Sequence, residues 1–118
     1  ATPKDHGLEN LIEGNLKPGT KVVVIEDLVS TGGSSLKTVD ILQTYGGEVI
    51  GMTCLFNYQF PMAVKRFHEA NINLVALCSY PTMLEVAEET CYISPSEAEE
   101  LREWRKDPAD WVPNSMKE

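Results

Sequence analysis

Short apolar runs alternate along this chain with amphipathic stretches in which apolar residues recur at helical spacing. The first run, Val22 to Ile25, consists of four β-branched residues and is typical of a strand buried on both faces of a parallel sheet. Two further runs, over 48–56 and 72–77, also read as strands. The apolar pattern therefore predicts three strands.

Helices are predicted between and after these strands from their capping signals. Residues with small hydroxyl side chains cap helices well, and a glutamate three positions later completes a capping box. The predicted starts are Ser34 or Ser35, Pro61, Thr82 and Ser94. Gly46 is expected to end the first helix as its C-cap, and the second is expected to end near Ala70.

This alternation of strand and helix predicts an α/β fold, a parallel sheet flanked by helices with right-handed crossovers. Ligands bind such sheets at the carboxyl ends of the strands. From Asp107 the chain continues as a polar tail broken by prolines, in which Trp111 is expected to pack back onto the body.

The segment after the first strand carries the candidate chemistry. Two acids, Glu26 and Asp27, stand where that strand is expected to end, and a hydroxyl- and glycine-rich loop follows, comprising Ser30, Thr31, Gly32, Gly33 and Ser34. Glycines let the backbone approach a ligand, and hydroxyls and free amides at a helix N-terminus bind phosphate. The carboxylates can accept hydrogen bonds from vicinal hydroxyls. The ligand that this predicts is a ribose 5-phosphate.

This segment also permits two other interpretations. Any doubly wound α/β protein can end a strand in aspartate and turn through glycine, and the two acids can simply be a solvated strand end. The chain contains neither the Gly-Lys-Ser/Thr of a Walker A loop nor a dinucleotide-binding Gly-x-Gly-x-x-Gly pattern. These two nucleotide-binding motifs are therefore excluded.

The run from Lys21 to Ser35 resembles the phosphoribosyl pyrophosphate (PRPP) motif of type I phosphoribosyltransferases, in which a hydrophobic strand precedes two acids, two variable residues and a Thr-Gly-Gly-Ser type loop. Upstream, Lys4-Asp5-His6-Gly7 resembles part of the mobile active-site loop of orotate phosphoribosyltransferases. The resemblance implies a Rossmann-like phosphoribosyltransferase core and transfer of phosphoribosyl from PRPP to orotate. The alternative for Lys4 and His6 is a solvated N-terminus.

The resemblance also implies a role for each motif residue. Lys4 and His6 would stabilise the departing pyrophosphate, and Asp27 would act with Glu26 on the ribose hydroxyls. The 5-phosphate would lie in the loop, where Ser30 also faces orotate. Mg²⁺ would bind through substrate oxygens and water. The substrate-binding set is Glu26, Asp27, Leu28, Val29, Ser30, Thr31, Gly32, Gly33, Ser34 and Tyr58.

Tyr58 marks a departure from the family pattern. In better-known bacterial members an arginine near the end of the next strand contacts orotate, and here Tyr58 stands in its place. A tyrosine can stack on a pyrimidine or hydrogen-bond to it, but it cannot form a bidentate ion pair with a carboxylate. The other interpretation of Tyr58 is an aromatic residue that anchors the loop.

Orotate phosphoribosyltransferases are about twice as long as this chain. We therefore expect a C-terminal half, truncated at the N-terminus and lacking the hood over the base, and catalytically silent by itself. Three segments are predicted. Residues 1–20 would be a remnant of the mobile loop, 21–106 the PRPP-binding core and 107–118 the tail.

The composition of the chain limits the kinds of partner that it can bind. The chain has 118 residues, 42% of them hydrophobic, and a formal charge of −8, which argues against a nucleic-acid or anionic-membrane surface. Three separated cysteines without a metal-binding spacing indicate a reduced, cytoplasmic protein, with Cys54 and Cys78 in the core. We expect a homodimer. The open alternatives are a phosphoribosyltransferase for another base and a PRPP-sensing regulator without catalysis.

Overall fold

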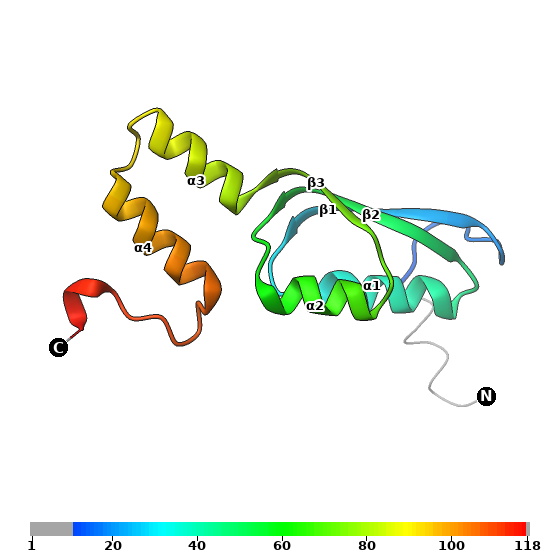
Figure 1. Ribbon diagram of the computed structural model, residues 1–118. Helices are drawn as coiled ribbons and strands as arrows, with labels where there is room; N and C mark the ends of the chain where they lie inside the picture. Colours follow the sequence, from blue (N-terminus) through cyan, green and yellow to red (C-terminus); the bar gives the residue numbers. More distant parts are fainter. Residues whose placement is uncertain (1–10, 118) are drawn as a thin grey trace.

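The computed structural model describes residues 11–117, and its centre is a three-stranded parallel sheet in the order β1-β2-β3. The strands are β1 (Lys21–Val29), β2 (Glu48–Asn57) and β3 (Leu74–Ser79). Helices α1 (Gly33–Thr44) and α2 (Pro61–Glu69) make the two crossovers, and both lie on the same face of the sheet (Figure 1). Successive crossovers of one hand in one direction place their helices on one face. The predicted α/β parallel sheet is confirmed.

The hydrophobic core lies between the sheet and these two helices. Val24, Met52 and Cys54 point from β1 and β2 toward the helices, and Val39 of α1 and Phe67 of α2 meet them. All five are buried, with exposed fractions of 7% or less. The core thus fixes α1 and α2 against the strands whose carboxyl ends carry the motif.

The opposite face, here called the open sheet face, is apolar and exposed. Because side chains alternate along a strand, the neighbours of the core residues point the other way. Its members are Val23, Ile25, Leu55, Val75 and Leu77, of which Ile25 is 80% and Leu77 78% exposed. The expectation that the first strand is buried on both faces is therefore wrong within residues 11–117, because no described element covers this face.

The end of β1 and the start of α1 both differ from the predictions. β1 continues through Val29, so Glu26 and Asp27 lie within the strand and not after it. Helix α1 begins at Gly33 with Gly32 as its N-cap, which places Ser34 and Ser35 inside the first turn. The geometry at this end is set by the left-handed backbone of a glycine rather than by a serine side chain.

At the other end of α1, Tyr45 is the C-cap, and Gly46 follows it with a φ of 89°. The Gly46 N–H donates to the Gln43 carbonyl at 3.0 Å. The predicted C-cap at Gly46 is therefore wrong by one residue: the cap is Tyr45, and the left-handed Gly46 just beyond it turns the chain away. The predicted bounds of β2 and α2 are confirmed to within one residue, whereas β3 begins two residues later than predicted.

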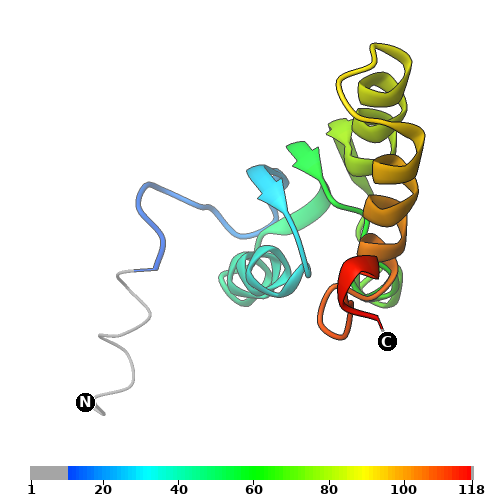
Figure 2. The ribbon, with the colours of Figure 1, turned by 90° about the vertical axis from the view of Figure 1, so that its left-hand side faces the viewer.

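Beyond the sheet, α3 (Tyr80–Glu89) and α4 (Pro95–Lys106) form a helix pair that extends away from the strands on the side of β3 (Figures 1 and 2). The described chain is accordingly elongated, with extents of 60 × 30 × 23 Å. Its radius of gyration of 18.6 Å exceeds the about 13 Å of a compact domain of about 100 residues.

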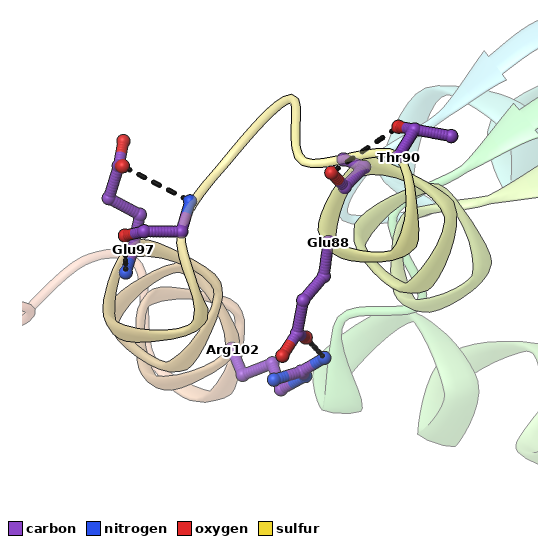
Figure 3. Close-up of polar contacts among 6 residues, drawn as sticks. Glu88, Thr90, Glu97 and Arg102 are labelled. Carbon is purple, nitrogen blue, oxygen red and sulfur yellow. Dashed lines mark hydrogen bonds and ion pairs between the residues drawn. The ribbon is translucent and has the colours of Figure 1, made fainter.

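The caps of this helix pair confirm one prediction and correct another. The capping box of α4 is present, since Ser94 Oγ accepts from the Glu97 N–H at 3.2 Å and Glu97 Oε1 accepts from the Ser94 N–H (Figure 3). The box predicted at Thr82 is wrong. The N-cap of α3 lies three residues earlier, at Ser79, whose side chain accepts from the Thr82 N–H.

An ion pair joins the two helices. The Arg102 guanidinium of α4 donates to Glu88 Oε2 of α3 at 2.7 Å across the gap between the helices (Figure 3). The hydrogen bond that Arg102 donates to the Glu88 carboxylate raises the pKa of Arg102 above its ordinary value. Both side chains are about one third exposed, so the pair orients the helices but stabilises them only modestly.

The tail returns to α4 and not to the sheet. Half-buried Trp111 lines a hollow of about 680 Å³ together with Glu103 and Lys106 of α4. A short 3₁₀ helix (Asn114–Met116) follows, and its first N–H donates to Glu100 Oε1 at 3.0 Å. The expected return of Trp111 thus takes place on the helix pair. No helix within residues 11–117 is both long enough and apolar enough to cross a membrane.

Only one of the three cysteines lies in the core. Cys54 on β2 is buried, and this burial, together with nearby Glu26, raises the pKa of its thiol. Cys78 and Cys91 are exposed. The expectation that Cys78 is a core residue is wrong, because β3 is an edge strand and Cys78 lies near its end.

Candidate functional site

The loop between β1 and α1 presents unpaired backbone amides at the carboxyl end of β1. Gly32 caps α1 with a left-handed backbone (φ 83°, ψ −4°), and its carbonyl accepts from the Leu36 N–H at 3.0 Å. The N–H groups of the first turn have no intrahelical partner. Within the described part of the chain no side chain caps them. This end of α1 is therefore open to an anionic ligand, which the helix dipole also favours.

Gly32 also lies against α2 at very short range. A Cβ added there would lie 3.0 Å from Phe67 Cε2 and 3.7 Å from the Ala63 Cα. Gly32 is buried as a result. Two constraints, the positive φ and the contact with the Phe67 ring, thus require glycine at this position.

The side chain of Arg66 on α2 also contacts this loop. Arg66 Nη1 donates to the Thr31 carbonyl oxygen at 3.0 Å, although 35 residues separate the two in the chain. A Cβ added at Gly33 would lie 3.5 Å from the same nitrogen. Sequence reasoning missed both Arg66 and Phe67, because no local pattern in the second helix indicates contact with the loop.

The two acids leave β1 on opposite sides. Glu26 is half-buried and pairs in register with Cys54 of β2 on the helix-covered face. Asp27 is exposed, and its Oδ1 accepts from the Leu28 N–H at 2.7 Å. Successive side chains of a strand point to opposite faces, so the acids do not form one side-by-side pair.

The remaining motif residues divide into exposed and buried positions. Thr31, Gly33 and Ser34 are exposed, and Ser30 is half-buried. Leu28 is 45% exposed, whereas Val29 is 1% exposed and its side chain belongs to the core. The hydroxyls of the loop are therefore accessible, while the Val29 side chain is occupied by packing.

Tyr58 follows β2 next to this edge and joins an aromatic cluster, defined here as Phe56, Tyr58, Phe60, Tyr80 and Trp104. Its ring lies 5.0 Å from that of Phe60 and 5.1 Å from that of Phe56, centroid to centroid. The Tyr58 N–H donates to the Val29 carbonyl at 3.1 Å, which ties the end of β2 to the end of β1. These contacts are those of an aromatic residue that anchors the loop.

The turn after Tyr58 is held by polar contacts as well. Gln59 has a φ of 54°, its N–H donates to Asn57 Oδ1 at 2.9 Å, and its carbonyl accepts from Arg105 Nη1 of α4 at 2.7 Å. Helix α4 therefore positions a turn at the same edge of the sheet as the β1 loop. Lys4 and His6, the other two predicted catalytic residues, lie outside the described residues.

A family profile covers the loop and the sheet around it. The profile of the phosphoribosyl transferase domain matches residues 6–78, more than half of the chain. The chain belongs to the phosphoribosyltransferase family. The match ends within β3, so the strands, α1, α2 and the β1 loop lie inside the family domain, while α3 and α4 follow it.

Curated relatives of this phosphoribosyltransferase chain bear the name orotate phosphoribosyltransferase. The protein of Phocaeicola vulgatus is 59% identical over 111 residues, which are 94% of this chain and 52% of that protein. The protein of Listeria innocua is 46% identical over 108 residues, 92% of this chain and 52% of that protein. The chain thus spans about half the length of the curated relatives that it matches, and the resemblance to this family is confirmed.

Solved structures agree with this assignment. UMP synthase of Leishmania donovani matches with a TM-score of 0.67 and 26% identity over 79% of this chain and 21% of that one. The Mycobacterium tuberculosis orotate phosphoribosyltransferase in complex with PRPP matches with a TM-score of 0.55 and 30% identity over 60% of this chain and 42% of that one. The predicted phosphoribosyltransferase fold is therefore confirmed.

Proposed function

We propose that the protein containing these residues transfers a phosphoribosyl group from PRPP to orotate, giving orotidine 5-phosphate and pyrophosphate. The observation that carries the proposal is the β1 loop, where a left-handed Gly32 leaves the first amides of α1 free and follows a strand that contains Glu26 and Asp27. Relatives named for orotate cover 94% of the chain, which supports orotate as the base.

In this proposal the loop holds the 5-phosphate, and the acids hold the ribose. The amides and the Thr31 and Ser34 hydroxyls donate to the phosphate oxygens. Asp27 and Glu26 accept from the ribose hydroxyls. Displacement of pyrophosphate builds positive charge on the sugar ring, and carboxylates held close to the ring favour that charge.

In this proposal Mg²⁺ would enter the site bound to the oxygens of the substrate. Asp27 is an exposed residue of β1 near the carboxyl end of the strand, and its oxygens would contact the hydrated ion of a bound Mg²⁺–PRPP complex. Mg²⁺ usually keeps several waters and phosphate oxygens as ligands. No set of three metal-ligating side chains lies close together within residues 11–117. When bound, the ion would neutralise charge on the departing pyrophosphate.

Lys4 and His6 complete the proposed chemistry. Lys4 would offer a compact cation to pyrophosphate oxygens, and His6 would donate hydrogen bonds to the same group. We propose that the whole protein works in the cytoplasm as a homodimer. The 118-residue chain by itself is proposed to be inactive, since the relatives use about twice as much chain.

The test is an assay of the full-length protein with PRPP, Mg²⁺ and one base at a time. We expect PRPP-dependent consumption of orotate and release of pyrophosphate, with no turnover of uracil, adenine or hypoxanthine. Turnover of one of those bases instead of orotate would replace the base assignment. PRPP binding without turnover of any base would indicate the regulator alternative. Turnover of orotate by residues 1–118 alone would contradict their proposed inactivity.

A further inference from the structure

Helix α2 touches the β1 loop through Arg66 and Phe67, and these contacts have no role in the function proposed above. We propose that Arg66 is a positioning residue that sets the direction of a loop peptide and so tunes its affinity for the 5-phosphate. The inference rests on the proposal that this loop binds the 5-phosphate of the substrate.

The hydrogen bond from Arg66 fixes one peptide group of the loop. Its Nη1 lies 3.0 Å from the Thr31 carbonyl oxygen. In a trans peptide the carbonyl and the following N–H point in opposite directions, and the peptides of residues 11–117 are trans. With the Thr31 carbonyl directed toward α2, the Gly32 N–H is directed away from α2. Arg66 thereby controls the orientation of an amide in the phosphate-binding loop.

The Phe67 ring keeps the loop close enough for this contact. Phe67 is 5% exposed, and its Cε2 comes within 3.0 Å of the position of a Cβ on Gly32. The ring therefore fixes the distance between α2 and the loop, while Arg66 fixes the rotation of the peptide. Arg66 itself is exposed, so its substitution leaves the core intact.

The charge of Arg66 is also available to the loop. Among the described residues no carboxylate forms a salt bridge with Arg66, whereas its neighbour Lys65 lies 3.9 Å from Glu69 Oε1. A guanidinium donor polarises the carbonyl that accepts from it, and charge-assisted hydrogen bonds are the stronger kind. The polarised peptide then presents a better N–H donor on its opposite side.

Lys65 supplies a matched control. It carries the same charge on the same helix, it is 77% exposed, and its recorded polar contact is with Glu69 rather than with the loop. The experiment compares Arg66→Met, Arg66→Lys and Lys65→Met in the full-length protein. Titration calorimetry measures the affinity for ribose 5-phosphate and, separately, for pyrophosphate, which lacks a 5-phosphate.

We expect Arg66→Met to weaken ribose 5-phosphate binding about tenfold, the size expected for a charge-assisted hydrogen bond. Pyrophosphate binding and the melting temperature should stay unchanged, and so should both affinities in Lys65→Met. Arg66→Lys, which keeps a charged donor, should recover part of the loss. In steady-state kinetics the loss should appear in the KM for PRPP and not in kcat, because the 5-phosphate is held equally before and during reaction.

Three results would overturn the inference. The first is that Arg66→Met binds ribose 5-phosphate with wild-type affinity. The second is that Lys65→Met loses as much affinity for ribose 5-phosphate as Arg66→Met does. The third is that Arg66→Met also loses affinity for pyrophosphate and has a lower melting temperature. The first shows no role for Arg66, the second a remote charge effect and the third a merely structural role. Failure of the wild-type protein to bind ribose 5-phosphate or PRPP would instead overturn the proposed function on which the inference rests.

Discussion

Tyr58 and Phe60 stack almost parallel at the carboxyl end of β2, with ring centroids 5.0 Å apart and 8° between the ring planes. Tyr80 and Trp104 of the helix pair meet the Tyr58 ring at 5.7 and 6.0 Å. Tyr58 thereby links the sheet to α3 and α4. This packing holds the Tyr58 ring in place at the carboxyl end of β2.

Truncation of Tyr58 should therefore cost stability. We expect Tyr58→Ala to lower the free energy of unfolding by about 3 kcal/mol through lost aromatic packing, and Tyr58→Phe to change it by less than about 0.5 kcal/mol. Chemical denaturation of the full-length protein measures both. A raised KM for orotate in Tyr58→Phe at unchanged stability would support the predicted base contact, whereas an unchanged KM would argue that Tyr58 serves packing alone.

Asp27→Asn should reduce turnover strongly and leave the fold intact. The substitution removes the charge proposed to favour the developing positive ring but hardly changes the volume of an exposed side chain. We expect kcat/KM to fall about 100-fold, the scale of losing one electrostatic contact in a transition state. Asp40→Asn, which removes the same charge from an exposed position on α1, is the control and should be neutral. Unchanged kcat/KM in Asp27→Asn would refute its role.

Gly32→Ala should both destabilise the protein and weaken PRPP binding. The backbone at this position has a φ of 83°, and an added Cβ would lie 3.0 Å from Phe67 Cε2. We therefore expect the free energy of unfolding to fall by about 2 to 4 kcal/mol. Gly19→Ala is a matched control, since Gly19 has a φ of 81° but no atom within 4 Å of the added Cβ. Gly19→Ala should lower the free energy of unfolding by only about 1 kcal/mol. Thermal unfolding measures both variants. Equal losses in the two variants would show that the Phe67 contact is unimportant.

The open sheet face should drive self-association of the isolated 118-residue chain. Exposed Ile25, Leu55 and Leu77 form an apolar surface next to β-strand edges, and such surfaces favour assembly. We expect light scattering to report dimers or larger species, and Leu77→Lys to shift them toward monomer. Gln43→Lys, an exposed substitution on α1, should change nothing. A monomeric wild-type chain at high concentration would contradict this expectation.

The three thiols should differ in reactivity. In the native 118-residue chain Cys78 and Cys91 should react quickly with a disulfide reagent, while buried Cys54 should react only after unfolding. The raised pKa of Cys54 keeps it protonated at alkaline pH values where an unfolded cysteine ionises. The folded form therefore loses stability relative to the unfolded form as the pH rises through that range. The stability of Cys54→Ser should be measured over the same pH range, and we expect this loss of stability at alkaline pH to be absent. A loss that persists in Cys54→Ser would be due to another group.

Local patterns accounted for most of the secondary structure and for the family of the chain. The capping box at Ser94, the starts of β2 and α2, and the helix-ending role of Gly46 were readable because each depends on residues within a few positions. The order of strand, acids and glycine loop identified the family for the same reason. The misplaced cap at Thr82 shows the limit of that approach, since Ser79 offers an equally good hydroxyl three positions earlier and only the folded chain selects it.

Tertiary structure decided which sheet face is covered and how the loop is held. The run Val22 to Ile25 is apolar on both faces, and only the positions of α1 and α2 show that Val24 is buried while Ile25 is exposed. The contact between Arg66 and Thr31 joins residues 35 positions apart, and that between Arg105 and Gln59 joins residues 46 apart. Such contacts arise from where whole helices lie relative to the loops at the edge of the sheet, and the residues around each partner carry no local sign of them.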